Sequence, residues 1–337
     1  AAGVLPDSQL LLTILTVALL ALFLTFNLPV KLSSAHLSFT FFLLTSLIAT
    51  FFSVWPVNSF LTLLLFGCYF LVFLLAYNLS FAVKLTSLAY AVVIATAVLA
   101  GGFLLAAFIG YRFAPNLAVG LLVLLLPLLI ALFSSETSET KKFGLAFVFL
   151  LYLPALYLAF TKSSWEFGVW QAAVKMILSR PLFGFGPGAF GTALPQFQVN
   201  SVYSLYTHNS YLQLASEAGV LAFVLLVFTF ALLLKEGYQR LATAQDKQEK
   251  YLRVGLLASL TTFMLHNLVD YSWYVPAAAL LFWFLAGLAV SSPPADVVAP
   301  ALAKTKTTAL SWQRQVSFAL LTLALLPLTF AYIGTDL

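Results

Sequence analysis

Charge is the scarcest property of this 337-residue chain. Only 8% of its residues are charged, whereas 62% are hydrophobic and the mean hydropathy is +1.03. A water-soluble domain typically carries about a quarter of its residues as charged side chains, so the composition excludes a soluble globule and predicts a polytopic membrane protein. The net charge of +5 gives no reason to invoke nucleic acid, because nucleic-acid binders gather positive charge on one solvent-exposed face.

Cysteine and the common catalytic motifs are scarce too. The single cysteine, Cys68, lies inside an apolar run and cannot form an intrachain disulfide. No Asp-x-Asp pair, His-x-x-x-His pair, Walker loop or Gly-x-Ser-x-Gly motif occurs, so the sequence predicts no metal site and no cofactor. Residues 1–9 contain no basic segment, so no cleavable signal peptide is expected there.

Long apolar runs dominate what is present. A transmembrane helix needs roughly 20 apolar residues. These runs are apolar on every side, whereas the strands of a membrane barrel alternate apolar and polar residues. We therefore predict an all-α, polytopic transmembrane helical bundle with about ten spans in this chain. The expected spans are 8–26, 36–54, 57–77, 86–110, 116–134, 143–161, 209–234, 251–270, 275–291 and 314–333.

The basic residues predict the orientation of the bundle, because Lys and Arg near helix ends are retained on the cytoplasmic side. The densest basic loop is 235–253. If this loop is cytoplasmic, strict alternation of the spans places twelve of the sixteen Lys and Arg residues inside. The four that remain outside are Arg112, Lys162, Lys175 and Arg180.

A long external loop divides the chain into three expected regions. Residues 1–161 are the N-terminal transmembrane helices, residues 162–208 the external loop, and residues 209–337 the C-terminal transmembrane helices. The alternation puts both termini outside, so we expect a further helix before Ala1. The abrupt junction at Ser164-Trp165 indicates that residues are missing there.

The external loop is predicted to contain an amphipathic helix and a glycine-rich turn. Apolar residues recur at helical spacing along one face of residues 165–178, which predicts a short helix lying on the membrane. Pro181 ends this helix, and four glycines with Pro187 make residues 184–191 too irregular for a helix or strand. Two interpretations remain open. The turn presents backbone N–H groups to a phosphate beside Arg180, or its glycines only allow close packing.

His208 is the strongest candidate for chemistry. Thr207 or Asn209 is expected to cap the following helix, which places the imidazole at the positive end of the helix dipole, where protonation is disfavoured. A neutral imidazole can act as a general base. The alternative is an interfacial histidine that only hydrogen-bonds a neighbouring loop. Glu217 lies about 13 Å further along the helix, where a carboxylate is either functional or held by a structural salt bridge or hydrogen bond.

A second polar cluster, residues 266–274, is predicted on the same side of the membrane. His266 and Asp270 are one helical turn apart and are expected to hydrogen-bond each other. The Trp and Tyr residues of this cluster are typical of the interfacial aromatic belt. Arg112 is either a second external cation for an anionic ligand or an arginine that snorkels to the lipid headgroups.

Four segments resemble a known family. RPLFGFGPGAF at 180–190 and HNSYLQLASEAGV at 208–220 resemble the signature of the O-antigen ligase and polymerase superfamily of bacterial membrane glycosyltransferases. RFAPNLA at 112–118 and HNLVDYSWYVPA at 266–277 are also similar to that family. The resemblance covers about residues 110–290, and the loop and histidine segments are its most specific part.

The resemblance implies a GT-C-like helical enzyme with about twelve or more spans in the intact chain. Its expected place is the bacterial cytoplasmic membrane, surrounded by lipid, with the active site on the external face. The external loop would take a glycan from undecaprenyl diphosphate and pass it to an acceptor hydroxyl on a glycan, lipid or protein. Attack opposite the leaving group would invert the anomeric centre, and neither metal nor cofactor is implied.

The family also implies roles for particular residues. His208 would be the catalytic base, and Arg180 and Arg112, with Lys162 and Lys175, would bind the diphosphate. The residues expected to support them are Asn209, Tyr211, Gln213, Glu217, His266 and Asp270.

One junction departs from the family pattern, and several functions stay open. Lys162-Ser163-Ser164 stands where the family usually has Thr-x-Ser-Arg, and a second family arginine near Trp170 is also absent. Missing residues at this junction would account for both. Repeat-unit polymerases and protein O-oligosaccharyltransferases share these motifs, so the glycan, the acceptor and the oligomeric state are open. A transporter of the bicarbonate-carrier type would need ionisable residues along its path, and a non-catalytic scaffold would tolerate replacement of His208.

Overall fold

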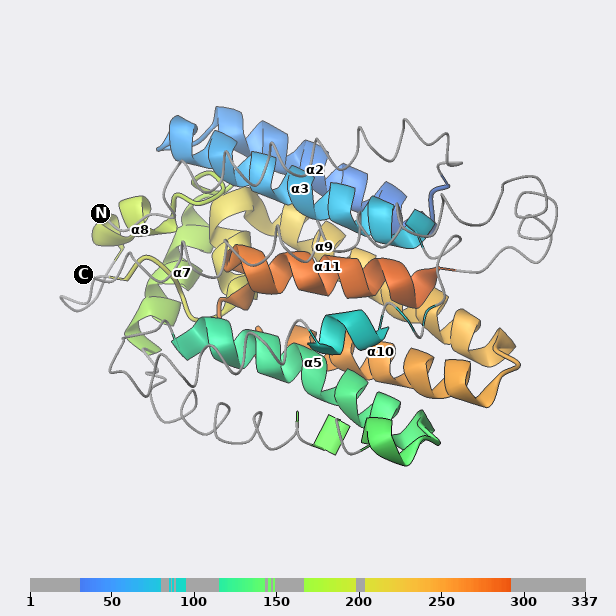
Figure 1. The fold of residues 1–337 in the computed structure, drawn as a ribbon. Helices are drawn as coiled ribbons and strands as arrows, with labels where there is room; N and C mark the ends of the chain where they lie inside the picture. The colour runs from blue at the N-terminus through green and yellow to red at the C-terminus, as the bar shows by residue number, and fades with distance from the viewer. Residues whose placement is uncertain are drawn as a thin grey trace.

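The protein is an all-helical bundle. The computed structural model describes residues 31–79, 85, 87, 89–94, 115–142, 145–146, 148, 167–197 and 204–291. Within those residues all regular secondary structure is helical, which confirms the predicted all-α class. In the described part of the chain, six long helices run along one common direction, and short helices gather at one end of them (Figure 1).

The bounds of the helices are as follows. The bundle consists of α2 (Ser34–Phe51), α3 (Pro56–Leu79), α5 (Pro115–Ser135), α9 (Ser210–Thr243), α10 (Lys247–His266) and α11 (Pro276–Val290). The remaining helices are α7 (Phe167–Ser179), α8 (Phe190–Ala193), η1 (Leu194–Gln196) and η2 (Ser272–Tyr274).

Each bundle helix coincides with one predicted span. α9 continues to Thr243, beyond the predicted end at residue 234, and α10 begins and ends four residues earlier than predicted. Among the described residues, three helices are long and apolar enough to cross a membrane, namely Ser34–Phe51, Pro56–Asn78 and Ser210–Thr243. The predicted spans 8–26 and 314–333, and most of 86–110 and 143–161, lie outside the described residues, so the count of ten stays a prediction.

Small residues allow the bundle helices to approach closely. A Cβ atom on Gly287 of α11 would lie 2.6 Å from Ala76 Cβ of α3, and one on Gly255 of α10 would lie 2.5 Å from Ala131 Cβ of α5. Without a hydrophobic driving force between helices in lipid, such small-residue contacts let van der Waals packing hold the helices together. The helix pairs α3–α11 and α5–α10 are therefore closely packed.

Aromatic rings pack in the interior of the bundle. Trp283 of α11 stacks on Phe39 of α2 with ring centroids 4.2 Å apart, and it also contacts Phe230 of α9. His36, near the start of α2, is buried and stacks on Phe73 of α3 with ring centroids 3.8 Å apart. The described interior of the bundle is thus a closely packed apolar core rather than a polar channel.

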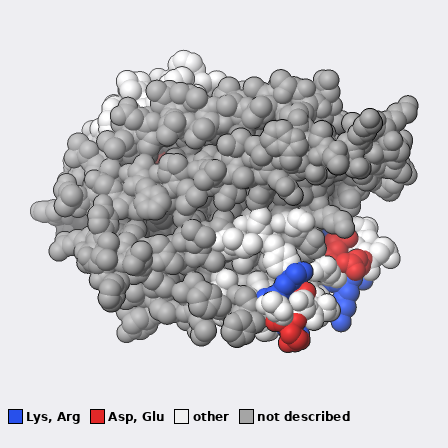
Figure 2. All heavy atoms as spheres, viewed as in Figure 1, with Lys and Arg blue, Asp and Glu red and all other residues white. Residues whose placement is uncertain are grey.

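Positive charge is concentrated at one end of the bundle. Eight of the ten described Lys and Arg residues lie where α2 and α10 begin and where α5 and α9 end, and Lys175 and Arg180 lie at the other end. The charged side chains visible in Figure 2 gather at the former end. This distribution agrees with the predicted alternation of the spans. Which end faces the cytoplasm stays a prediction from the positive-inside rule.

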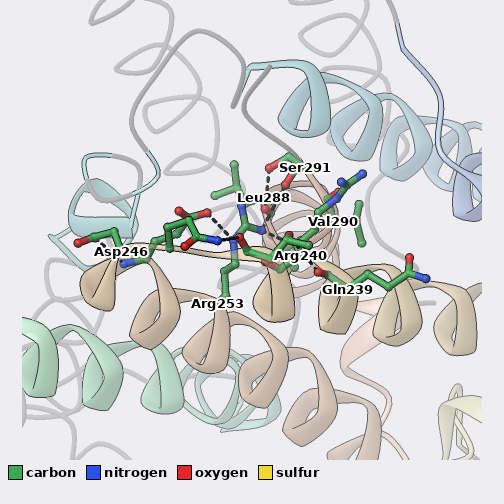
Figure 3. Close-up of polar contacts among 11 residues, drawn as sticks. Gln239, Arg240, Asp246, Arg253, Leu288, Val290 and Ser291 are labelled. Atoms are coloured by element: carbon green, nitrogen blue, oxygen red, sulfur yellow. Dashed lines mark hydrogen bonds and ion pairs between the residues drawn. The ribbon is translucent and has the colours of Figure 1, made fainter. Parts of the chain in front are cut away.

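Two of these basic residues also hold the end of α11 (Figure 3). Arg253 Nη1 of α10 donates to the carbonyl oxygens of Ala289 and Ser291 at 3.3 and 3.2 Å, and Arg240 Nε of α9 donates to that of Val290 at 3.1 Å. The last carbonyls of a helix have no partner within the helix and attract cations. Arg253 is buried and also pairs with Glu249 at 2.7 Å.

Replacing Arg253 should therefore destabilise the bundle. Arg253→Leu leaves buried carbonyl groups and the Glu249 carboxylate without their donor, which we expect to cost about 3 kcal/mol. The measurement is the thermal unfolding midpoint of the purified protein in detergent. Lys250→Leu, an exposed change on the same helix, is the control and should cost less than about 0.5 kcal/mol. Equal midpoints for the two variants would contradict this role.

Candidate functional site

Helix α7 covers the glycine-rich turn at the end of the bundle. The predicted helix is present, and its apolar residues Val169, Ala172, Ala173 and Met176 are buried. They pack against Phe185, Phe190, Ala193 and Leu194, which follow in the same segment. This face of α7 is therefore buried within the protein and is not the face that could lie on a membrane. The tertiary packing of the turn onto α7 was not evident from helical spacing alone.

The glycine-rich turn uses its backbone N–H groups within the protein. Gly184, Gly186 and Gly188 have positive φ values of 60°, 104° and 71°, which side chains other than glycine rarely adopt. Each amide from Gly184 to Phe190 donates to a protein acceptor, apart from Pro187, which has no N–H group. None of these amides is left for a phosphate in this conformation. Of the two open interpretations, the structure supports the closely packed turn.

A break in α9 supplies several of those acceptors. Gly219 has φ 86° and ψ 167°, so the helix is interrupted about two and a half turns after its first residue, Ser210. The carbonyls of Ser216 and Glu217 accept from Phe185 N at 3.1 Å and Gly186 N at 2.8 Å, and Val220 N donates to Pro181 O at 2.8 Å. The turn is thus held against α9 by backbone hydrogen bonds at Pro181 and at Phe185 and Gly186.

The Glu217 side chain completes this pairing. It is fully buried, and its two carboxylate oxygens accept from Gly188 N at 2.8 Å and Phe190 N at 3.1 Å. Gln213 Nε2 donates to the same carboxylate at 3.2 Å. Glu217 was expected to be either functional or held by a salt bridge or a neighbouring helix. Its donors include Gln213 of the same helix and the backbone amides of the turn, and Tyr274 of η2 lies beside it. The side chain occupies the place that an anion would take in such a turn.

His208 lies at the start of α9, as predicted. Asn209 is the N-cap, and its side chain accepts from Tyr211 N at 3.1 Å and Leu212 N at 3.0 Å, which confirms one of the two expected caps. His208 is half-buried and has a φ of 54°. Its ring meets Tyr271 edge-on with centroids 5.0 Å apart. The imidazole therefore stands beside the positive end of the α9 dipole.

The turn after α10 anchors this end of α9. Ser210 N donates to the carbonyls of Asn267 and Asp270 at 3.0 and 2.9 Å, and Ser210 Oγ donates to Asn267 Oδ1 at 2.7 Å. The Tyr211 hydroxyl donates to Met264 O at 2.8 Å. His266 Nε2 and Asp270 Oδ2 are 2.9 Å apart, which confirms that these two side chains meet. The anchoring role of Asn267 was missed, because its partner Ser210 is distant in sequence.

The expected cations are only partly described. Arg180 is exposed beside the glycine-rich turn, with its guanidinium 4.6 Å from the centre of the Phe185 ring. Lys175 is exposed on α7. Arg112 and Lys162 lie outside the described residues. Within the described part of the chain, no group of three or more His, Cys, Asp and Glu side chains is arranged to hold a metal ion.

Fold and site together define a helical membrane protein with a polar, loop-covered site at one end of its spans. The family model for O-antigen ligase (Wzy_C) matches residues 58–227, half of the chain. The chain therefore belongs to the O-antigen ligase family, which confirms the resemblance seen in the sequence. No curated protein and no solved structure matches it.

Substitution of Gly219 should detach the glycine-rich turn from α9. A Cβ atom there would lie 2.0 Å from Leu182 O, and the backbone conformation is one that essentially only glycine adopts. We expect Gly219→Ala to lower stability by about 2 kcal/mol or more, read from the thermal unfolding midpoint.

Gly67→Ala is the matched control for this change. Gly67 lies within α3, and a Cβ atom there meets nothing within 4 Å. Alanine is favoured over glycine inside a helix by about 0.5–1 kcal/mol, so this variant should be unchanged or more stable. A Gly219→Ala protein as stable as Gly67→Ala would show that the break in α9 is not required.

Proposed function

We propose that this protein is a metal-independent, inverting glycosyltransferase. It moves a glycan from undecaprenyl diphosphate to an acceptor hydroxyl on the external face of the bacterial cytoplasmic membrane. The observation that carries this proposal is the position of His208, half-buried at the start of α9 and at the same end of the bundle as Arg180, in a chain of the O-antigen ligase family. Arg180 and His208 belong to the two motifs that join this chain to the family.

His208 acts as the general base. The acceptor oxygen attacks the anomeric carbon, the bond from that carbon to the diphosphate breaks, and the hydroxyl proton passes to the imidazole. The positive end of α9 favours the neutral imidazole that this step needs. Tyr274 is unsuited to the role, because burial and then the neighbouring Glu217 raise its pKa well above the ordinary value of 10.0.

Arg180 binds the diphosphate and stabilises its charge as it leaves. A diphosphate is already a good leaving group, so cations and a base are sufficient without a metal. Arg112, Lys162 and Lys175 are the further cations that we assign to this role. Asn209, Tyr211, Gln213, Glu217, His266 and Asp270 support the site through the helix start and its neighbouring turns.

The packing of the bundle favours an enzyme over a transporter. Transport needs ionisable groups along a path through the membrane. The described buried ionisable side chains instead have local partners. Glu217 binds the glycine-rich turn, Arg253 holds the end of α11, and His36 stacks on Phe73. Asp270 meets His266, and Glu136 accepts from the backbone N–H groups of Thr137 and Ser138. The aromatic core lies between them. Repeat-unit polymerases and protein O-oligosaccharyltransferases remain alternatives within the family, since they differ in the acceptor.

The test is transfer of a glycan from purified undecaprenyl-diphosphate oligosaccharide in the presence of EDTA. Wild-type protein should turn over in EDTA, because no metal takes part. His208→Ala should lose at least about 10²-fold in kcat, the usual contribution of a positioned base. Arg180→Ala should mainly raise the KM for the donor.

Lys250→Ala, at the opposite end of the bundle, is the control and should retain wild-type kinetics. Loss of wild-type turnover on adding EDTA, with recovery on adding a divalent cation, would overturn the metal-independent mechanism. Equal rates for His208→Ala and wild type would overturn the assignment of the base and favour the transporter or scaffold alternative.

A further inference from the structure

We propose that a chain of hydrogen bonds through Trp170, Gln213 and Glu217 holds the base and the Arg180 turn in a fixed relation to each other. These three residues are positioning residues, because they act through the backbone on either side of the site. The proposal rests on the proposed function for its kinetic consequences, and its structural part can be tested separately.

The first link joins α7 to the residue before the base. Trp170 Nε1 donates to Thr207 O at 2.8 Å. Thr207 is fully buried, and its hydroxyl both donates to Asn209 O and accepts from Asn209 N at 3.1 Å. The backbone on both sides of His208 is therefore held by hydrogen bonds. His208 itself has a φ of 54°, which a residue with a side chain adopts only where its surroundings hold it there.

The second link runs along α9. Gln213 Oε1 accepts from Thr207 N at 2.9 Å, while Gln213 Nε2 donates to Glu217 Oε1 at 3.2 Å. Residues 213 and 217 are four apart, so they lie on one face of the helix. The Gln213 side-chain amide thus accepts through its oxygen and donates through its nitrogen. A glutamate could not replace this amide, because it has no N–H to donate to Glu217.

The third link joins Glu217 to the turn that carries Arg180. Gly188 N and Phe190 N donate to the two carboxylate oxygens, and Gly186 N donates to the backbone carbonyl of Glu217. The other end of the turn is held where Val220 N donates to Pro181 O, directly after Arg180. A shift of Gln213 is thus transmitted to the base through Thr207 and to the cation through Glu217.

The kinetics of glycan transfer distinguish a positioning role of these hydrogen bonds from a role in packing alone. Trp170→Phe removes the donor at the base end alone, so kcat should fall about tenfold while the donor KM stays within twofold. Gln213→Leu breaks the chain in the middle, so kcat should fall about tenfold and the donor KM should rise about tenfold. A tenfold change corresponds to about 1.36 kcal/mol, which lies within the range of about 0.5–1.5 kcal/mol that one hydrogen bond contributes.

Thr229→Val is the matched control. This change also removes a buried hydroxyl from α9. The Thr229 hydroxyl donates to Ser38 Oγ at 2.8 Å and lies away from the chain of hydrogen bonds. This variant should keep both kinetic constants within twofold of wild type. If Trp170→Phe and Gln213→Leu behave like Thr229→Val while His208→Ala is inactive, the proposal is overturned and the proposed function stands.

Amide hydrogen exchange tests the structural part without any turnover. In Gln213→Leu, exchange should rise about tenfold both in residues 184–190 and in residues 204–209, and in Thr229→Val neither segment should change. In Trp170→Phe the rise should be confined to residues 204–209. Unchanged exchange in both segments of Gln213→Leu overturns the proposal. If exchange rises in Gln213→Leu as expected but the wild-type protein transfers no glycan, the chain of hydrogen bonds is supported and the proposed function is overturned.

Discussion

A carboxylate buried in an apolar bundle needs hydrogen-bond donors, and Glu217 finds them in the backbone of Gly188 and Phe190. The site depends on this contact. A buried carboxyl group without these partners would be destabilising, so the glycine-rich turn must stay against α9. The backbone amides of this turn, from Gly184 to Phe190, likewise find their acceptors within the protein. Each partner thus satisfies groups that the other leaves unpaired.

The break at Gly219 makes this arrangement possible. In a continuous helix the carbonyls of Ser216 and Glu217 would accept from residues four positions further on. The break releases them to the amides of Phe185 and Gly186. It also separates α9 into a short first part, which carries His208 at its start, and a long second part that packs in the bundle. The first part is therefore positioned by the loops around it as well as by the helix it continues into.

The same principle operates at the opposite end of the bundle. The carbonyls at the end of α11 are satisfied by Arg240 and Arg253, whose positive charges also determine the predicted orientation. In a chain with so little charge, individual ionisable residues serve more than one purpose. Composition alone cannot separate these purposes, because the topological role depends on position along the chain and the structural role depends on partners distant in sequence.

The sequence by itself determined the helical class, the approximate positions of the six described bundle helices, the α7 helix, a cap at Thr207 or Asn209, and the resemblance to the family. These features follow from local properties: apolar length, helical periodicity and short motifs. Only the tertiary structure decided that α7 packs its apolar face against the glycine-rich turn, that Glu217 takes the amides of that turn, and that Asn267 anchors Ser210. Those contacts join segments far apart in the chain, and hydrogen bonds to backbone groups depend on conformation rather than on side-chain identity, so no pattern of residue types announces them.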